Sequence, residues 1–287
     1  MLSMRIKFLS APTRNYLPRN TSKILFAFAL LAWLKQDQAR ADERSFTYSY
    51  EADSVLPKGG WEFEQWITYK GGKEDGIFSR WDIREEIEYG VADKYTTALY
   101  LNLRSTHSDG VPGSADLDRF EFKGISSEHK LQLLNPHTKP IGLLLYGEIS
   151  TDGDELELEE KLVLSKTLDE KWTLAFNAVL EQEWEFEADE TEKTLGLEFT
   201  AGVSYKISPH WAVGLEAMNV RKFDGLSFSS QQSSAYFAGP NLHYGASKWW
   251  ATLTVMPQVG GRPDTGSSLN LRDHERVEVR LIAGFGF

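Results

Sequence analysis

The chain has 287 residues, a formal net charge of −11 and no cysteine, and 41% of its residues are hydrophobic. The lack of cysteine excludes a disulfide scaffold and a thiolate metal site, and the acidic charge excludes a nucleic-acid partner, because phosphate binding needs a basic face. Nine tryptophans and eleven tyrosines are typical of proteins at a membrane interface, where one end of the ring meets apolar groups and the other meets water.

The first 41 residues have the three parts of a secretory signal. A basic region precedes the apolar run Ile24–Leu34, and Ala39-Arg40-Ala41 forms a small-residue cleavage site. The apolar run has eleven residues, too few for the roughly 20 that span a bilayer, so an N-terminal anchor helix is the less favoured alternative. We predict a signal peptide over residues 1–41, which leaves 24 basic and 41 acidic residues, or −17, in the mature chain.

Residues 42–60 form a second segment, which lacks a clear alternating pattern. It carries Tyr48, Tyr50 and Leu56, whose large apolar side chains favour burial away from water. The sequence leaves two locations open, the periplasm and the mouth of the lumen.

From Trp61 to Phe287 the hydrophobic pattern has period two. The final segment is the clearest, with Val279 and Leu281 on one face and Glu278 and Arg280 on the other. Repeated alternation over about ten residues indicates transmembrane β-strands, which bacterial barrels have in even number. The pattern predicts an all-β, up-and-down antiparallel transmembrane barrel over residues 61–287, with twelve strands at 61–70, 78–89, 95–103, 117–134, 141–150, 155–165, 172–181, 194–207, 211–221, 234–245, 249–257 and 277–287.

One predicted strand is irregular. Alternation over Leu117–Leu134 breaks at Gly124–Ser127. An extra residue in one strand of a pair produces this break, so we expect a β-bulge there.

Four short turns resemble one another. Gly90–Tyr95, Thr167–Trp172, Ile207–Trp211 and Ala246–Trp249 each end on an aromatic residue that opens the next strand. We expect these turns on the periplasmic side and longer loops on the other, at 104–115, 185–192, 222–233 and 260–274. At the turn side we predict an aromatic girdle of Trp61, Tyr89, Tyr95, Trp172, Tyr205, Trp211, Tyr244, Trp249 and Phe287.

The polarity of the strands is the reverse of that in a soluble barrel. One face is apolar enough for lipid, apart from Glu85 and Glu160, and the other face is charged. Acids outnumber bases on the charged face, so an open lumen should favour cations. The predicted lumen charges, which set selectivity or close the lumen by pairing across it, are Glu62, Glu64, Arg80, Arg84, Glu86, Glu88, Arg119, Glu121, Lys123, Glu278 and Arg280. Closure of the barrel should bring Arg280 near Glu62 or Glu64.

Two motifs carry a family resemblance. Leu56-Pro57-Lys58-Gly59-Gly60-Trp61 precedes the first strand, and Glu88-Tyr89-Gly90-Val91-Ala92-Asp93 closes the second. They resemble motifs of an uncharacterised family of bacterial outer-membrane barrels and of the porins named for the MetA-pathway of phenol degradation. The resemblance implies an outer-membrane location and uptake of small hydrophobic or aromatic compounds. Phe287 at the end of the chain resembles the residue by which barrel assembly machinery recognises such proteins.

Candidate catalytic groups are sparse. Ser127 and His129 are two apart on one strand face, but no third member is evident, and such pairs arise often by chance. Asn241 and His243 are expected to bond wall neighbours. Glu157 and Glu159 are interpreted as charged residues that line the lumen rather than as the catalytic carboxylate pair of a glycosidase. The remaining histidines are expected in loops or turns, at His107, His137, His210 and His274.

The sequence as a whole favours a passive channel for small solutes in the bacterial outer membrane, with an acidic, cation-leaning lumen. A non-conducting structural or interaction barrel is the alternative, and a membrane-embedded lipid hydrolase is favoured least. We expect no enzyme activity, cofactor or metal. The expected partners are outer-membrane lipid, barrel assembly machinery and a small-molecule solute.

Overall fold

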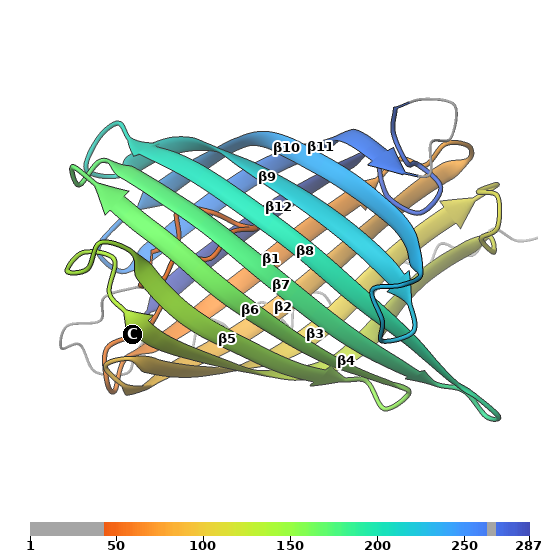
Figure 1. Cartoon of the computed structure of the whole chain (residues 1–287), viewed down its shortest axis with the longest axis horizontal. Helices are drawn as coiled ribbons and strands as arrows, with labels where there is room; N and C mark the ends of the chain where they lie inside the picture. The colour runs from red at the N-terminus through yellow and green to blue at the C-terminus, as the bar shows by residue number, and fades with distance from the viewer. Residues whose placement is uncertain (1–42, 263–267) are drawn as a thin grey trace, which may run out of the picture. The chain divides into compact units, whose positions relative to one another are not determined.

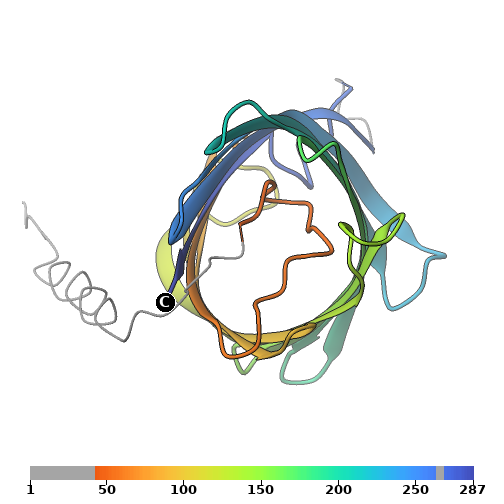
Figure 2. The same ribbon diagram turned by 90° about the vertical axis from the view of Figure 1, so that its left-hand side faces the viewer.

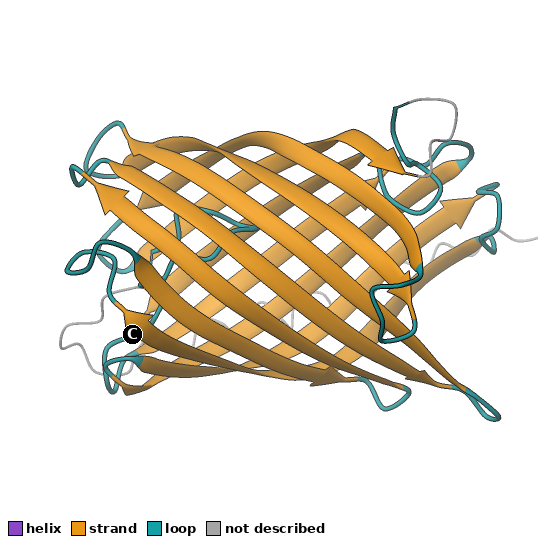
Figure 3. Cartoon of the chain, viewed as in Figure 1, coloured by secondary structure: helices purple, strands orange, loops and turns teal. Residues whose placement is uncertain are grey.

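The computed structural model describes residues 43–262 and 268–287, and the predicted signal peptide lies outside them. These residues form a closed barrel of antiparallel strands (Figures 1 and 3). None of them belongs to a helix long and apolar enough to cross a membrane. The strands are β1 (Trp61–Gly71), β2 (Ile77–Ala92), β3 (Tyr95–Asp109), β4 (Leu117–Leu134), β5 (Gly142–Thr151), β6 (Glu155–Leu168), β7 (Trp172–Phe186), β8 (Thr191–Lys206), β9 (Trp211–Asp224), β10 (Gln231–Gly245), β11 (Trp249–Arg262) and β12 (Val277–Gly286).

Each strand pairs with its neighbours in the chain, and β1 closes the barrel against β12 from Glu62↔Gly286 to Gly71↔Val277. The predicted all-β, twelve-stranded, up-and-down barrel is therefore confirmed. Closure pairs both edge strands, so no row of backbone N–H and C=O groups is left open.

The strands extend further than the alternation predicted at the end away from the C-terminus. β3 continues to Asp109, β7 to Phe186 and β9 to Asp224, which leaves connections of only 110–116, 187–190 and 225–230. The predicted long loops are wrong there, and His107 lies in β3 rather than in a loop. In β3 both strand faces become polar over residues 104–109, so the period-two signal fades there while backbone pairing continues.

Glu85 and Glu160 remain on the outer face. Glu85 lies opposite Gln65 and Leu101, and Glu160 lies opposite Gly147 and Leu180, with no register shift at either position. Neither carboxylate turns inward.

The predicted bulge in β4 is confirmed. The β3–β4 register shifts between Leu101 and Leu103, whose partners are Ile125 and Phe122. Gly124 occupies the bulge with a φ of +83°, and a Cβ there would lie 2.0 Å from the carbonyl oxygen of Thr151. Glycine alone fits this left-handed conformation and close approach.

We predict that Gly124→Ala destabilises the barrel by about 1–3 kcal/mol, since the substitution combines backbone strain with a clash. Urea unfolding followed by tryptophan fluorescence measures this loss. Gly147→Ala is the matched control, because a Cβ at Gly147 in β5 meets nothing within 4 Å. Equal free energies of unfolding for the two variants would contradict the conclusion that only glycine fits at position 124.

Residues 44–56 lie inside the barrel, residues 57–60 lead along its rim to β1, and we call residues 43–60 the plug. The view along the barrel axis shows this segment crossing the interior (Figure 2). Phe46, Tyr48, Tyr50 and Leu56 are buried within it. Of the two locations that the sequence left open, the structure has the lumen.

Candidate functional site

Glu216 of β9 holds the start of the plug. Its Oε1 accepts a hydrogen bond from the backbone N–H of Thr47 at 2.9 Å. Its Oε2 accepts from the N–H groups of Tyr48 and Ser49 at 2.8 and 2.9 Å. Thr254 on β11 donates its hydroxyl to the same carboxylate at 2.6 Å. Successive N–H groups around one carboxylate form an anion-binding nest, which fixes the direction of the plug as it enters the lumen.

Further wall side chains replace the hydrogen bonds that a strand neighbour would supply. Asn177 on β7 both accepts from the N–H of Tyr50 and donates to its carbonyl, at 2.6 and 3.0 Å. Ser165 accepts from the N–H of Ala52 at 2.8 Å. The other wall residues that bond the plug backbone are Thr96, Gln132, Asn241, Thr252 and Arg280. Side chains from eight strands therefore hold the plug, and buried backbone polar groups require such partners.

A layer of stacked cations and aromatic rings lies where the plug meets the wall. The guanidinium of Arg44 lies 3.9 Å from the ring centroid of Tyr50, and that of Arg280 lies 4.1 Å from the centroid of Tyr48. The ammonium of Lys161 lies 4.5 Å from the centroid of Tyr50. Cations over ring faces in a partly dry site attract the ring quadrupole, which adds to the hold on the plug.

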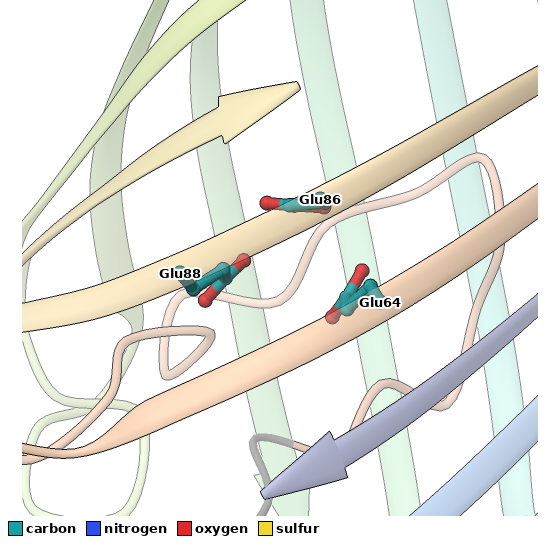
Figure 4. Close-up of side chains that lie close together, drawn as sticks. All are labelled: Glu64, Glu86 and Glu88. Atoms are coloured by element: carbon teal, nitrogen blue, oxygen red, sulfur yellow. The ribbon is translucent and has the colours of Figure 1, made fainter. Parts of the chain in front are cut away.

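A buried carboxylate cluster lies on β1 and β2 beside the plug (Figure 4). Glu64, Glu86 and Glu88 have oxygens within 4.8 Å of one another. Trp66 donates its indole N–H to Glu64 at 2.8 Å and to Glu86 at 3.0 Å. Lys130 of β4 forms an ion pair with Glu88. The three carboxylates are thus stabilised by buried partners, Trp66 and Lys130, rather than by solvent.

Glu128 and Arg44 complete the surroundings of this cluster. The Nζ atom of Lys130 lies 3.3 Å from Glu128, and Nη1 of Arg44 lies 3.8 Å from Glu64. All of these side chains are at most 2% exposed. Lys130 therefore carries a charge on which two buried carboxylates depend.

A cavity of about 480 Å³ lies between the plug and the loop end of the barrel. Its floor includes Tyr48 and Tyr50 of the plug, and loop residues 273–275 contribute to its lining. The rest of the lining comes from wall residues of ten strands, most of them charged. The plug thus forms part of the boundary of the cavity.

The predicted lumen charges face inward but not as one set. Glu62, Glu64, Glu86 and Glu88 are buried at plug level, and Glu278 is buried beside Lys70. Arg119 and Glu121 pair with each other towards the outer end of β4. Those that line the cavity are Arg80, Arg84, Lys123, Glu278 and Arg280.

Arg280 does not approach Glu62 or Glu64, so that prediction is wrong. The β1–β12 register places Arg280 opposite Thr68, to which it donates a hydrogen bond at 2.9 Å, while Glu62 and Glu64 lie opposite Gly286 and Gly284. Glu62 instead accepts from the indole N–H of Trp250 at 2.6 Å. The register between β1 and β12 therefore determines which residues Arg280 contacts.

Sequence reasoning missed several contributors, namely Arg44, Asp82, Glu128 and Lys130. Glu128 and Lys130 could have been found, because the bulge at Gly124 turns these even-numbered positions of β4 inward. Arg44 lies in a segment without periodicity, so no pattern assigned it to the lumen.

The predicted girdle residues gather at the turn end in close aromatic pairs. Trp61 stacks against Tyr89 and Phe287, with centroids 4.6 and 6.5 Å apart. The other contacts are Trp172–Tyr205 at 4.6 Å, Trp211–Tyr244 at 4.8 Å, Tyr244–Trp249 at 4.9 Å and Tyr95–His129 at 6.1 Å. These pairs recur along the rim where the chain reverses.

The histidines considered as catalytic candidates, His129 and His243, lie on opposite faces of the barrel wall. His129 is exposed on the outer face, 3.4 Å from the Ser127 hydroxyl and 2.9 Å from that of Tyr95. His243 bonds Thr252 at 2.7 Å, as expected for a wall residue. Asn241 bonds the Ser45 carbonyl of the plug rather than only the wall.

The β11–β12 loop packs a buried histidine at the cavity mouth. His274 lies 3.1 Å from the Ser233 hydroxyl, and burial lowers the pKa of His274 to about 4. Burial also acts to raise the pKa of Glu275, but Lys70 and Lys73 outweigh it and hold that pKa below its usual value. Both groups therefore favour the folded loop in neutral solution.

Acidification should loosen this loop. An unfolded His274 titrates near 6.5 and the folded one near 4, so its contribution is complete above about pH 6.5 and is lost as the pH falls towards 4. The difference corresponds to roughly 3 kcal/mol at most. Limited trypsin digestion between pH 7.5 and 5, where the loop offers Arg272 and Arg276, should accelerate relative to a denatured control substrate. The change should be smaller in His274→Gln, and an equal change in both proteins would contradict the assignment.

Residues 38–287 match the model of a family of unknown function, DUF6662. The chain belongs to this family. No curated protein matches it. Many solved structures are similar to it. The COG4313 outer membrane channel from Pseudomonas putida F1 has a TM-score of 0.63 at 10% identity, with 85% of this chain and 100% of that chain covered.

Two porins follow at lower similarity. The NanC porin has a TM-score of 0.49 at 9% identity over 78% of this chain and 98% of that chain. The KdgM porin, solved in complex with disordered oligogalacturonate, has a TM-score of 0.46 at 9% identity over 79% of this chain and 99% of that chain. At these identities, the similarity to the P. putida channel extends to the fold, which is that of an outer-membrane barrel.

Proposed function

We propose that this member of DUF6662 is a passive channel of the bacterial outer membrane for small polar solutes, and that the plug closes it at rest. The observation that carries the proposal is the charged cavity of about 480 Å³, which lies inside the closed barrel and ends on the plug. A structural barrel would gain nothing from a large charged void, because filling it with apolar side chains would stabilise the fold.

The outer surface supports the location. Large apolar side chains such as Leu99, Phe120 and Leu215 are exposed around the barrel, and in water so much apolar surface would be a liability. Lipid removes this cost. The aromatic pairs at the turn end form the proposed girdle, and Phe287 is the proposed recognition residue for barrel assembly machinery.

Two finer features of the channel are also proposed. Carboxylates in excess around the cavity favour cations. The resemblance to the porins of the MetA-pathway of phenol degradation adds small aromatic compounds as a further class to test, although the charged lining of the cavity favours polar solutes.

Gating by the plug can be tested with one disulfide. The chain has no cysteine, so Ala52→Cys with Ser165→Cys introduces the only two thiols, at residues already in contact. We expect the oxidised protein to be silent in planar bilayers and the reduced protein to conduct in discrete steps. Reversal potentials measured in a KCl gradient should show that the channel is more permeable to K⁺ than to Cl⁻.

Each single-cysteine variant is the control, because it should conduct under both redox conditions. Conductance of the fully oxidised double variant would contradict gating by the plug. Silence of the folded wild type and of the reduced variant would favour a non-conducting barrel.

A further inference from the structure

Most charges of the cavity are separated into two walls, while Lys222 of β9 and the loop residues Asp273 and Glu275 lie outside both. The first runs over β12 and β1–β4 and carries six bases and two acids, namely Lys70, Arg80, Arg84, Arg104, Lys123 and Arg280 with Asp82 and Glu278. The second runs over β5–β8 and carries seven acids and one base, namely Glu148, Glu155, Glu157, Glu159, Glu181, Glu183 and Glu198 with Lys161. A total count of acidic and basic residues over the whole lumen does not show this separation.

The two walls face each other across the lumen. In a closed ring of twelve strands, strands six places apart lie on opposite sides, so β1 faces β7 and β2 faces β8. Figure 1 shows β6–β8 in the front layer and β1–β3 behind them. A solute in the cavity therefore lies in a field directed across the barrel.

The acidic wall is compensated only in part, because Arg84 pairs with Glu148 and Lys123 with Glu155, while four of its seven carboxylates have no such partner among the described residues. The β6–β7 register places Glu157 directly opposite Glu183, and Glu159 directly opposite Glu181. Like charges at such positions repel. Lys161 forms an ion pair with Glu159 at 2.8 Å, but no ion pair with Glu157, Glu181, Glu183 or Glu198 is found in the part of the chain that the structure describes.

The basic wall offers a matching anion site. The guanidinium groups of Arg80 and Arg104 share the single carboxylate of Asp82, at 3.0 and 2.6 Å. The two guanidinium groups exceed this one carboxylate, and the charge of Arg80 also acts on Glu275 of the cavity lining. A guanidinium can bind a carboxylate through two parallel N–H groups, which suits this site to a carboxylate on a solute.

We propose that the cavity binds a small dipolar solute, with an ammonium group at the Glu157–Glu183 wall and a carboxylate at Arg80 and Arg104. This inference rests on the proposed channel and names its substrate class. A solute with both charges relieves the repulsion on one wall and pairs with the guanidinium groups on the other. A volume of about 480 Å³ accommodates an amino acid or a compound of similar size.

Three probes of equal chain length test the proposal. Isothermal titration calorimetry of the full chain, folded in detergent micelles, compares 6-aminohexanoate with hexylamine and hexanoate, which each retain one of the two charges. We expect 6-aminohexanoate to bind at least tenfold more tightly than either, a difference of about 1.4 kcal/mol. The advantage should fall in high salt, which screens both walls.

Variants assign the two ends of the solute. Glu157→Gln with Glu183→Gln should reduce the affinity for 6-aminohexanoate to that for hexanoate. Arg80→Gln with Arg104→Gln should reduce it to that for hexylamine. Glu160→Gln on the outer face is the matched control and should bind as the wild type does.

The possible failures are distinguishable. Equal binding of hexylamine and 6-aminohexanoate would replace the dipolar site with a cation site, and equal binding of hexanoate would replace it with an anion site. If none of the three binds while the disulfide pair still gates conductance, this inference is overturned and the channel stands. If no conductance is found in any state, the proposed function itself fails.

Discussion

Replacement of Glu216 by alanine is expected to release the plug. The substitution leaves the N–H groups of Thr47, Tyr48 and Ser49 without their acceptor. A buried donor left unsatisfied costs about 1–3 kcal/mol. Three such groups shift the balance between closed and open forms by roughly 3 kcal/mol or more, which corresponds to a factor of about a hundred.

Two measurements follow the release of the plug. Trypsin should cleave after Arg44, which is 1% exposed in the closed barrel, much faster in Glu216→Ala than in the wild type. Opening events in planar bilayers should rise at least tenfold.

Glu198→Ala is the control for Glu216→Ala. Glu198 lies on the neighbouring strand β8 and lines the cavity, and no hydrogen bond from it to the plug is found among the described residues. Protection of Arg44 in Glu216→Ala equal to that in the wild type would show that the nest around Glu216 does not hold the plug.

Replacement of Lys130 by methionine is expected to give the largest loss of stability. Lys130 pairs with Glu88 and Glu128, and all three side chains are at most 2% exposed. Methionine fills a similar volume but leaves two carboxylates uncompensated beside Glu64 and Glu86. Removing one partner of a buried ion pair costs about 3–5 kcal/mol.

The loss appears as a lower urea midpoint for unfolding of the detergent-folded barrel. A second substitution separates the loss of charge from the loss of packing. Glu88→Gln should be mildly destabilising alone and should recover part of the stability of Lys130→Met when the two are combined. Strictly additive losses would contradict the assignment of charge as the cause.

The strands were predictable because each carries its own signal. Alternation alone located all twelve, since one face of every strand meets apolar surroundings and the other meets the lumen. The bulge at Gly124 was predictable for the same reason, as an extra residue reverses the alternation. Strand ends at the loop side were not predictable, because β3 and β9 lose their apolar face there and backbone pairing leaves no mark on side-chain type.

The sequence by itself determined the fold class, the number of strands and most of the inward-facing positions, because these follow from local periodicity, but it missed inward-facing residues such as Asp82 and those beyond the bulge in β4, Glu128 and Lys130. Only the tertiary structure decided that the plug lies in the lumen, since its partners, such as Glu216, Asn177 and Arg280, are up to 233 residues away in the chain. It also decided which charges meet. Barrel closure and register place Arg280 beside Thr68 and set the β1–β4 bases against the β6–β8 acids, and neither depends on any single strand.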